Sequence, residues 1–263
     1  MKRILTSLAC LVWLMQSVFA NGHPNEWHQN KYSMFIHFGL YSVYGGVYEG
    51  KPVTRGYSEQ IQSFAGIFSD WYADTALQFN PTKFNADEIV ALAKEAGMRS
   101  IVLTTKHHDG FCLWQTEYTD HSMKSSPYKN GKGDIVKECA QACKRHGIKF
   151  GFYLSPWDRN SKYYGTDEYN TYYKNQLTEL LTNYGEIFYV WFDGACGEGP
   201  NGKKQVYDFE GYVDLVKKYQ PQANIFHDTG IIRWCGNEAG KAPFAQWAVV
   251  PYELCPMNEP QTN

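Results

Sequence analysis

The stretches RSIVLTTKHHDG (residues 99–110) and EIFYVWFDG (residues 186–194) decide the fold of this chain. Each begins as a run of β-branched and aromatic residues without helical spacing, and each ends in polar residues that include histidine or aspartate. Continuous apolar runs of this length are typical of strands buried on both faces of a parallel sheet. The two stretches therefore predict an α/β protein whose polar residues gather where the strands end.

Predicted strands and helices alternate along the rest of the chain. Further strands are predicted at residues 33–38, 148–154 and 224–228, with a weaker candidate at residues 245–250. Helices are predicted at residues 86–96, 134–146, 167–183 and 209–219. Residues 39–85, rich in glycine and aromatic residues, are too long for a passive connection and form a candidate functional loop.

Parallel alternation of this kind permits either an open doubly wound sheet or a closed barrel. No G-x-G-x-x-G turn follows the first predicted strand, as a dinucleotide-binding sheet would require. Site residues contributed by the ends of many strands are instead typical of a TIM-type (β/α) barrel. Polar and aromatic residues follow each predicted strand, namely His37, Lys106, His107, His108, Asp109, Tyr153, Ser155, Trp157, Asp158, Trp191, Asp193, His227 and Asp228.

The number of strands is short of a complete barrel. About six strands can be placed, whereas a closed barrel needs eight. Either one or two strands escape recognition, or the chain stops before the barrel closes. We therefore expect a TIM-type barrel that is incomplete at its C-terminus.

Composition and the first residues indicate an exported globular protein. The chain has 263 residues, 25 Lys and Arg against 27 Asp and Glu, and 16% aromatic residues. This charge balance favours neither nucleic acid nor an anionic membrane surface as a partner. Residues 1–20 begin with MKR, continue as an apolar run and end with VFA, which is the form of a signal peptide. We expect residues 21–263 to form one barrel domain, without a membrane span after cleavage.

Asp193 is the first candidate catalytic residue. It ends the predicted strand in VWFDG, where its carboxylate would point into the mouth of the barrel beside Trp191. A partly desolvated carboxylate surrounded by aromatic rings can act as a nucleophile or a general base. The alternative is that Asp193 only caps the following turn through Gly194.

Glu238 is the second candidate. It lies in the predicted loop IIRWCGNEAG, between glycines that allow the backbone to bend towards a site. Hydrolysis of a glycosidic bond with retention needs two carboxyl groups about 5 Å apart, one that attacks and one that protonates the leaving oxygen. A loop glutamate facing a strand-end aspartate meets this need, although most isolated loop glutamates are simply solvated.

Three histidines and several tryptophans form the remaining candidate site. His37, His107 and His108 could bind zinc, donate and accept hydrogen bonds with sugar hydroxyls, or lie in the core. The adjacent pair converges only if the strand has already ended, because neighbouring strand residues point to opposite faces. Cys139 and Cys143 lack a second pair of ligands at metal spacing, so we expect buried or free thiols. Flat rings suited to the faces of sugars occur at Trp71, Trp114, Trp157, Trp191 and Trp234.

These motifs resemble those of the α-L-fucosidases of glycoside hydrolase family 29. MFIHFGLYSV, DWY at residues 70–72, TTKHHDGFCLW, GFYLSPWD and VWFDG occur in the order and approximate spacing of that family. The resemblance covers residues 27–247. RWCGNEAG is similar to the acid/base loop of the subgroup that cleaves α-1,3- and α-1,4-linked fucose. Family members finish the barrel and add a C-terminal β-sandwich, which a chain ending at Asn263 would lack.

The resemblance implies a role for each matching residue. Asp193 would be the nucleophile that forms a covalent fucosyl-enzyme, and Glu238 the general acid and base. No metal or other cofactor is implied, and the partner is a fucosylated oligosaccharide or glycoconjugate. Residues implied to bind the substrate are the fucose-hydroxyl ligands His37, His107 and His108, the pocket residues Tyr153 and Trp191, a wall at Trp71 near the C5 methyl group, and the neighbouring Asp70.

The sequence thus favours an exported, retaining exo-α-L-fucosidase of a periplasmic, extracellular or lysosome-like compartment. A truncated, catalytically impaired fucose-binding remnant is the second hypothesis. A metal-dependent barrel hydrolase that uses the histidines is the third. The oligomeric state is not predicted.

Overall fold

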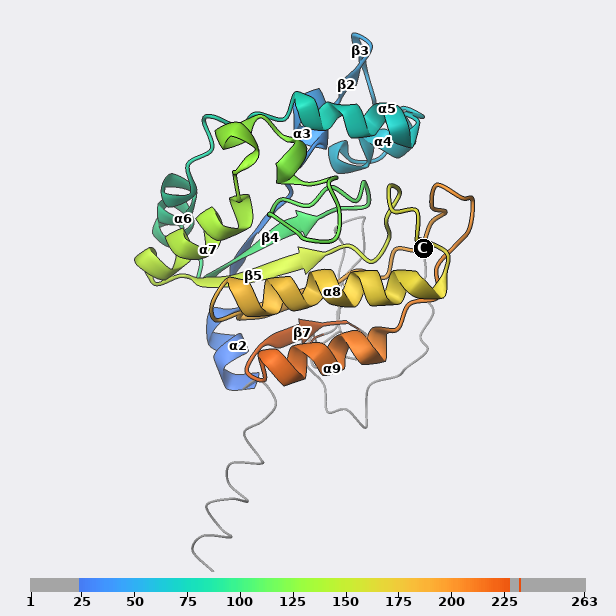
Figure 1. The fold of residues 1–263 in the computed structure, drawn as a ribbon. Coiled ribbons are helices and arrows are strands. Elements are labelled where there is room, and N and C mark those ends of the chain that lie inside the picture. The colour runs from blue at the N-terminus through green and yellow to red at the C-terminus, as the bar shows by residue number, and fades with distance from the viewer. Residues whose placement is uncertain (1–23, 228–231, 233–263) are drawn as a thin grey trace, which may run out of the picture.

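A computed structural model describes residues 24–227 and residue 232 of the chain (Figure 1). The predicted leader at residues 1–20, the candidate strand at residues 245–250 and the candidate acid/base Glu238 lie outside the described residues. None of the helices in the described part combines the length and the apolar content that crossing a membrane requires.

In the part of the chain that the structure describes, a parallel sheet of five strands forms the centre. Its strands are β1 (Ser33–Ile36), β4 (Ser100–Lys106), β5 (Lys149–Leu154), β6 (Tyr189–Phe192) and β7 (Asn224–Phe226). They lie side by side in the order β1-β4-β5-β6-β7, so each strand pairs with the next strand of this sheet along the chain. An order without reversal has no topological switch point, and it is the order of a barrel rather than of a doubly wound sheet.

The predicted α/β class with a parallel sheet is confirmed, but the predicted barrel is seen only in part. Across the described residues the sheet stays open, with β1 at one edge and β7 at the other. Strands β1, β6 and β7 are also shorter than the strands predicted at residues 33–38, 186–192 and 224–228. Before β6, for example, the Ile187 amide donates to the Gln220 side chain at 3.1 Å instead of to a neighbouring strand.

The main helices form where the sequence predicts them. The cap residues explain two of the boundaries: Asn85 accepts from the Glu88 amide at 3.2 Å, and Asp134 accepts from the Lys137 amide at 2.8 Å. Gly147 ends the second of these helices in the left-handed conformation that glycine favours. The predicted helices are α6 (Ala86–Glu95), α7 (Ile135–His146), α8 (Asp167–Asn183) and α9 (Phe209–Tyr219). A further helix, α2 (Pro24–Asn30), lies before β1 and was not predicted.

The two faces of the sheet hold different side chains. Along β4, Ile101 and Leu103 pack with residues of the helices, whereas Val102 belongs to a second cluster with Tyr153 and Phe226. Helices α8 and α9 run side by side along the outer face (Figure 1). The second cluster therefore marks the inner face, which points away from these helices and carries the candidate site.

The long loop after β1 is folded and lies over the sheet. The Tyr41 hydroxyl lies 3.1 Å from the Thr104 hydroxyl, and the Tyr72 hydroxyl donates to Asp109 at 3.1 Å, so the loop is fixed near the carboxyl end of β4. Its elements are α3 (Tyr41–Tyr44), β2 (Val47–Tyr48), β3 (Lys51–Pro52), η1 (Ser58–Gln60), α4 (Ile61–Phe64), α5 (Ser69–Ala73) and η2 (Asp74–Leu77). Two further 3₁₀ helices, η3 (Met123–Ser125) and η4 (Tyr128–Gly131), follow β4.

The cysteines of the described part are free thiols. Cys112, Cys139 and Cys143 are buried, and Cys196 is half-buried. Burial raises the pKa of Cys143 to about 12. Such a thiol stays protonated and unreactive at neutral pH, which agrees with the predicted buried or free thiols in α7.

Candidate active site

An irregularity in β4 places the two adjacent histidines. The pairing of β4 with β5 shifts between Thr104 and Lys106, so that β4 holds one extra residue there. Lys106 consequently pairs with Leu154 and is buried against α8, while His107 and His108 follow the end of the strand. Their ring centroids lie 4.1 Å apart. The pair thus converges because the strand has ended, as the sequence argument requires.

Asp193 follows β6 on the inner face, and both of its carboxylate oxygens have donors. The Tyr153 hydroxyl donates to Oδ2 at 2.6 Å, and the Ala195 amide donates to Oδ1 at 2.9 Å. Burial raises the pKa of Tyr153 well above its usual value, so its hydroxyl remains a donor. The Asp193 side chain is still 29% exposed. One oxygen therefore caps the turn, while the other faces the site.

His108 is a hydrogen-bond acceptor that points towards Asp193. Its Nδ1 lies 2.7 Å from the Ser155 hydroxyl, which itself donates to the carbonyl of Trp157 at 2.7 Å. A hydroxyl has one proton, so Ser155 must accept from Nδ1–H. Burial lowers the pKa of His108, and the attraction of Asp193 offsets this only in part. The neutral ring therefore has no proton on Nε2, which lies 3.7 Å from Asp193 Oδ2, too far for a hydrogen bond.

His107 lies deeper in the same group. Its Nδ1 is buried and has no hydrogen-bond partner among the described residues. Burial lowers the pKa of His107 well below its usual value, and the neighbouring imidazoles lower it further. A buried polar atom without a partner costs about 1–3 kcal/mol, which a bound hydroxyl group could recover.

His37 completes the histidine group at the open side of the site. Its side chain is exposed and stacks on Phe35 with ring centroids 5.0 Å apart. The His37 and His107 rings lie 5.6 Å apart. The structure thus brings all three predicted histidines to the same edge of the sheet as Asp193.

Aromatic side chains of the inner face form a wall beside these polar groups. Trp191 stacks on Phe226 with ring centroids 3.6 Å apart and meets the edge of Phe35 at 4.9 Å. Phe35 also meets Tyr153 at 6.1 Å. Phe35 and Phe226 were not predicted as site residues. The position of Phe35 two residues before His37 puts both side chains on the same face of the sheet and could have indicated its role. Phe226 lies beside Trp191 because the two residues pair in the sheet.

Asp70 and Trp71 lie on α5, in the loop over the sheet. Asp70 is exposed, and Trp71 is 65% exposed and meets the ring of Phe68 at 5.3 Å. In the same helix, the buried Tyr72 donates to Asp109 and anchors α5 near the end of β4. Burial raises the pKa of Asp109 to about 6. The apolar wall next to Asp193 is formed by the inner-face rings, whereas Trp71 stands on the neighbouring loop.

The described residues contain no group of three or more His, Cys, Asp or Glu side chains arranged to hold a metal ion. The cluster on the inner face combines one carboxylate, neutral imidazoles and aromatic rings. Carboxylates and imidazoles suit hydroxyl groups, and aromatic faces suit the C–H faces of a sugar ring. Fold and site together define an α/β protein with a parallel sheet and a cluster of polar and aromatic side chains at the carboxyl edge of that sheet.

Comparisons with known proteins identify the family. The family model described as alpha-L-fucosidase matches residues 13–245. The chain is 45% identical over 226 residues to alpha-L-fucosidase 1 of Arabidopsis thaliana. The matched region covers 85% of this chain and 40% of that protein. The chain therefore belongs to the α-L-fucosidase family. It covers 40% of the length of the Arabidopsis thaliana relative and 39% of the length of the putative alpha-L-fucosidase 1 of Oryza sativa.

Solved structures show the same relationship. A glycoside hydrolase 29 family member from a rumen bacterium is 38% identical with a TM-score of 0.67, covering 84% of this chain and 39% of that chain. The α-L-fucosidase AlfC of Lactobacillus casei, in complex with its α-L-fucose product, is 32% identical with a TM-score of 0.65. That match covers 76% of this chain and 69% of the L. casei chain.

Proposed function

We propose that this protein is a retaining exo-α-L-fucosidase in which Asp193 is the nucleophile. The observation that carries the proposal is the position of Asp193, which stands at the end of β6 with Oδ2 between Tyr153 and His108. Membership of the α-L-fucosidase family and the fucose bound to the similar L. casei enzyme support the choice of sugar.

The proposed reaction proceeds in two displacements. Asp193 attacks the anomeric carbon, and the bond to the leaving oxygen breaks as that oxygen takes a proton from the general acid. Water then attacks the fucosyl ester, gives its proton to the same residue, now a base, and frees Asp193. Glu238 is proposed as this acid and base on the resemblance of its loop alone, because it lies outside the described residues.

The remaining side chains are proposed to bind the sugar. One hydroxyl group of fucose is proposed to donate a hydrogen bond to His108 Nε2. Another is proposed to form a hydrogen bond with His107 Nδ1, which has no partner among the described residues. The wall of Phe35, Trp191 and Phe226 is proposed to pack against a C–H face of the sugar, and Trp71 is proposed to lie near its C5 methyl group. Asp70 and Trp71 are proposed to bind from α5, at the exposed side of the site.

The substrate and the compartment are also proposals. The substrate is proposed to be a fucosylated oligosaccharide or glycoconjugate with α-1,3- or α-1,4-linked fucose, on the resemblance of RWCGNEAG. Export to a periplasmic, extracellular or lysosome-like compartment rests on the form of residues 1–20.

The direct test is an Asp193→Ala variant assayed with an aryl α-L-fucoside. Turnover should be lost while the fold is kept. Added azide should restore turnover, because azide fits the space left by the carboxylate and attacks in its place, giving a fucosyl azide of inverted configuration. Asp214→Ala, which removes an exposed carboxylate on α9, is the matched control and should hydrolyse like the wild type. Wild-type turnover by Asp193→Ala would refute the assignment, and a wild type that binds fucose without hydrolysis would favour the binding remnant.

A further inference from the structure

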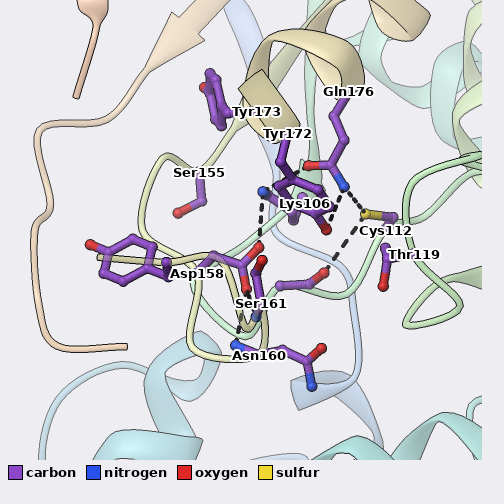
Figure 2. A network of polar contacts seen from close by, with 12 residues as sticks. Lys106, Cys112, Thr119, Ser155, Asp158, Asn160, Ser161, Tyr172, Tyr173 and Gln176 are labelled. Carbon is purple, nitrogen blue, oxygen red and sulfur yellow. Dashed lines mark hydrogen bonds and ion pairs between the residues drawn. The ribbon is translucent and has the colours of Figure 1, made fainter. Parts of the chain in front are cut away.

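A lysine with no access to solvent lies directly beneath the candidate site. The Lys106 side chain is 0% exposed, and its ammonium group donates to three oxygens. These are Asp158 Oδ2 at 3.2 Å, Gln176 Oε1 at 2.9 Å and the Tyr169 hydroxyl at 3.4 Å. Figure 2 shows Lys106 between Asp158 and Gln176. Each of its three protons thus has an acceptor.

Asp158, the partner of Lys106, is fixed as completely. Its side chain is 1% exposed, and its second oxygen accepts from the amides of Asn160 at 2.9 Å and Ser161 at 2.7 Å. Gly110 leaves room for this carboxylate, because a Cβ at that position would lie 2.4 Å from Asp158 Oδ1. The ion pair is therefore built into both the segment after β4 and the segment after β5.

Further hydrogen bonds tie the loop of residues 154–159 to its surroundings. From α8, the Tyr173 hydroxyl donates to the Leu154 carbonyl and the Tyr169 hydroxyl donates to the Pro156 carbonyl, both at 2.8 Å. Two backbone bonds join the loop to the end of β4: the Ser155 amide to the Lys106 carbonyl at 3.0 Å, and the Arg159 amide to the His108 carbonyl at 2.8 Å.

Stability alone does not explain a buried ion pair at this place. The cost of removing both charges from water is commonly as large as their attraction, so apolar residues of similar shape would stabilise the protein equally well or better. What the pair does supply is a fixed distance between two segments. One segment carries His107 and His108, and the other carries Ser155, the hydrogen-bond partner of His108.

We propose that the Lys106–Asp158 ion pair is a positioning element of the sugar site, holding Ser155 where it fixes His108 as the Nδ1–H tautomer with Nε2 free to accept from the sugar. The role of His108 towards sugar rests on the proposed function, whereas the tautomer is a property of the resting protein. If the loop moved, Ser155 would no longer hold the proton on Nδ1. A proton on Nε2 would then remove the lone pair with which His108 accepts from the sugar, and this N–H would face Asp193 Oδ2 at 3.7 Å.

The test separates positioning from stability with three variants of the full chain. Lys106→Met and Asp158→Asn each leave one buried charge without a partner, so both should lower the melting temperature and kcat/KM. The double variant removes both charges and should regain most of the melting temperature. It should nevertheless keep a loss of kcat/KM of about tenfold, equivalent to one hydrogen bond to the sugar.

Nitrogen-15 NMR of the histidine rings gives the decisive readout. Wild-type His108 should show a protonated Nδ1 and a bare Nε2, and the double variant should show a mixture of tautomers or Nε2–H. Tyr173→Phe, a milder change that frees the Leu154 carbonyl, should shift His108 in the same direction even if the charge variants fold poorly. Lys129→Met, which removes an exposed ion pair with Glu138, is the control and should leave the tautomer and kcat/KM unchanged.

Wild-type tautomer and kcat/KM in a stable double variant would overturn the proposal, as would Nε2–H in the wild type. The NMR result does not depend on turnover. A protein that releases no fucose but loses the Nδ1–H tautomer in the double variant would therefore contradict the proposed function and still support the positioning role.

Discussion

Replacing Tyr153 with phenylalanine should slow the second displacement more than the first. The variant keeps the buried ring and removes only the hydroxyl that donates to Asp193 Oδ2 at 2.6 Å. In the first step the Asp193 carboxylate loses its charge as it bonds to the sugar, so the lost donor does not raise that barrier. In the second step the carboxylate must regain its charge when it leaves, and Tyr153 is the side-chain donor that stabilises it.

The size of the effect follows from the type of hydrogen bond. A hydrogen bond to a charged group contributes about 1.5–3 kcal/mol, which corresponds to roughly 10- to 150-fold in rate. We therefore expect kcat to fall by that factor, KM to fall with it, and kcat/KM to change by only a few fold. The fucosyl-enzyme should accumulate in this variant.

Stopped-flow measurements with an aryl α-L-fucoside test this prediction. Tyr153→Phe should give a burst of aryl alcohol close to one equivalent of enzyme, followed by slow turnover. Tyr212→Phe, which removes a buried hydroxyl bonded to Asn170 on the outer side of the sheet, should leave kcat and KM unchanged. Equal losses of kcat and kcat/KM in Tyr153→Phe, without a burst, would refute the argument.

Three further predictions concern stability. Asp158→Asn should lower the free energy of unfolding by about 3–5 kcal/mol in urea, because Lys106 is left as an unpaired buried charge, and a loss below 1 kcal/mol would contradict the burial of the pair. Acidification from about pH 6.5 to pH 4 should destabilise the fold, because burial lowers the pKa of His121 to about 4 and the unfolded chain then binds more protons. His121 alone should lower the free energy of unfolding by about 3 kcal/mol over this range. Asp109, whose pKa is raised to about 6, binds a proton more readily in the folded state and opposes part of this loss. A free energy of unfolding that does not change over this range would contradict a buried, neutral His121. Gly197→Ala should lower the free energy of unfolding by about 1–3 kcal/mol and weaken fucose binding, because a Cβ there would overlap the Trp157 ring that contacts His108. Titration calorimetry with fucose measures the binding, and wild-type affinity in this variant would contradict the prediction.

Local signals in the sequence predicted the elements of the fold well. The helix over residues 134–146 could be placed because Asp134 and Gly147 are recognisable caps, and the helix over residues 167–183 has the bounds predicted. The ends of strands β6 and β7 were less predictable. They depend on partners far away in the chain, such as the Gln220 side chain, which accepts a hydrogen bond from the Ile187 amide.

The candidate site was predictable where a residue stands at the end of a strand. Asp193, His107 and His108 follow β6 and β4 directly, so alternation and strand ends suffice to place them. Phe35 and Phe226 were missed because their role depends on the register between strands, which sequence alone does not give. The orientation of Lys106 depends on the extra residue in β4, and such an irregularity has no signal in the residues themselves.

Trapping the covalent intermediate tests the role of Asp193 most directly. The protein would be incubated with an activated fucoside that carries fluorine at C2, which slows departure of the sugar, and then digested and analysed by mass spectrometry. The account predicts one fluorofucosyl group on the peptide that contains Asp193, and none in Asp193→Ala. A sugar attached to another residue, or an active enzyme that never carries the label, would contradict it.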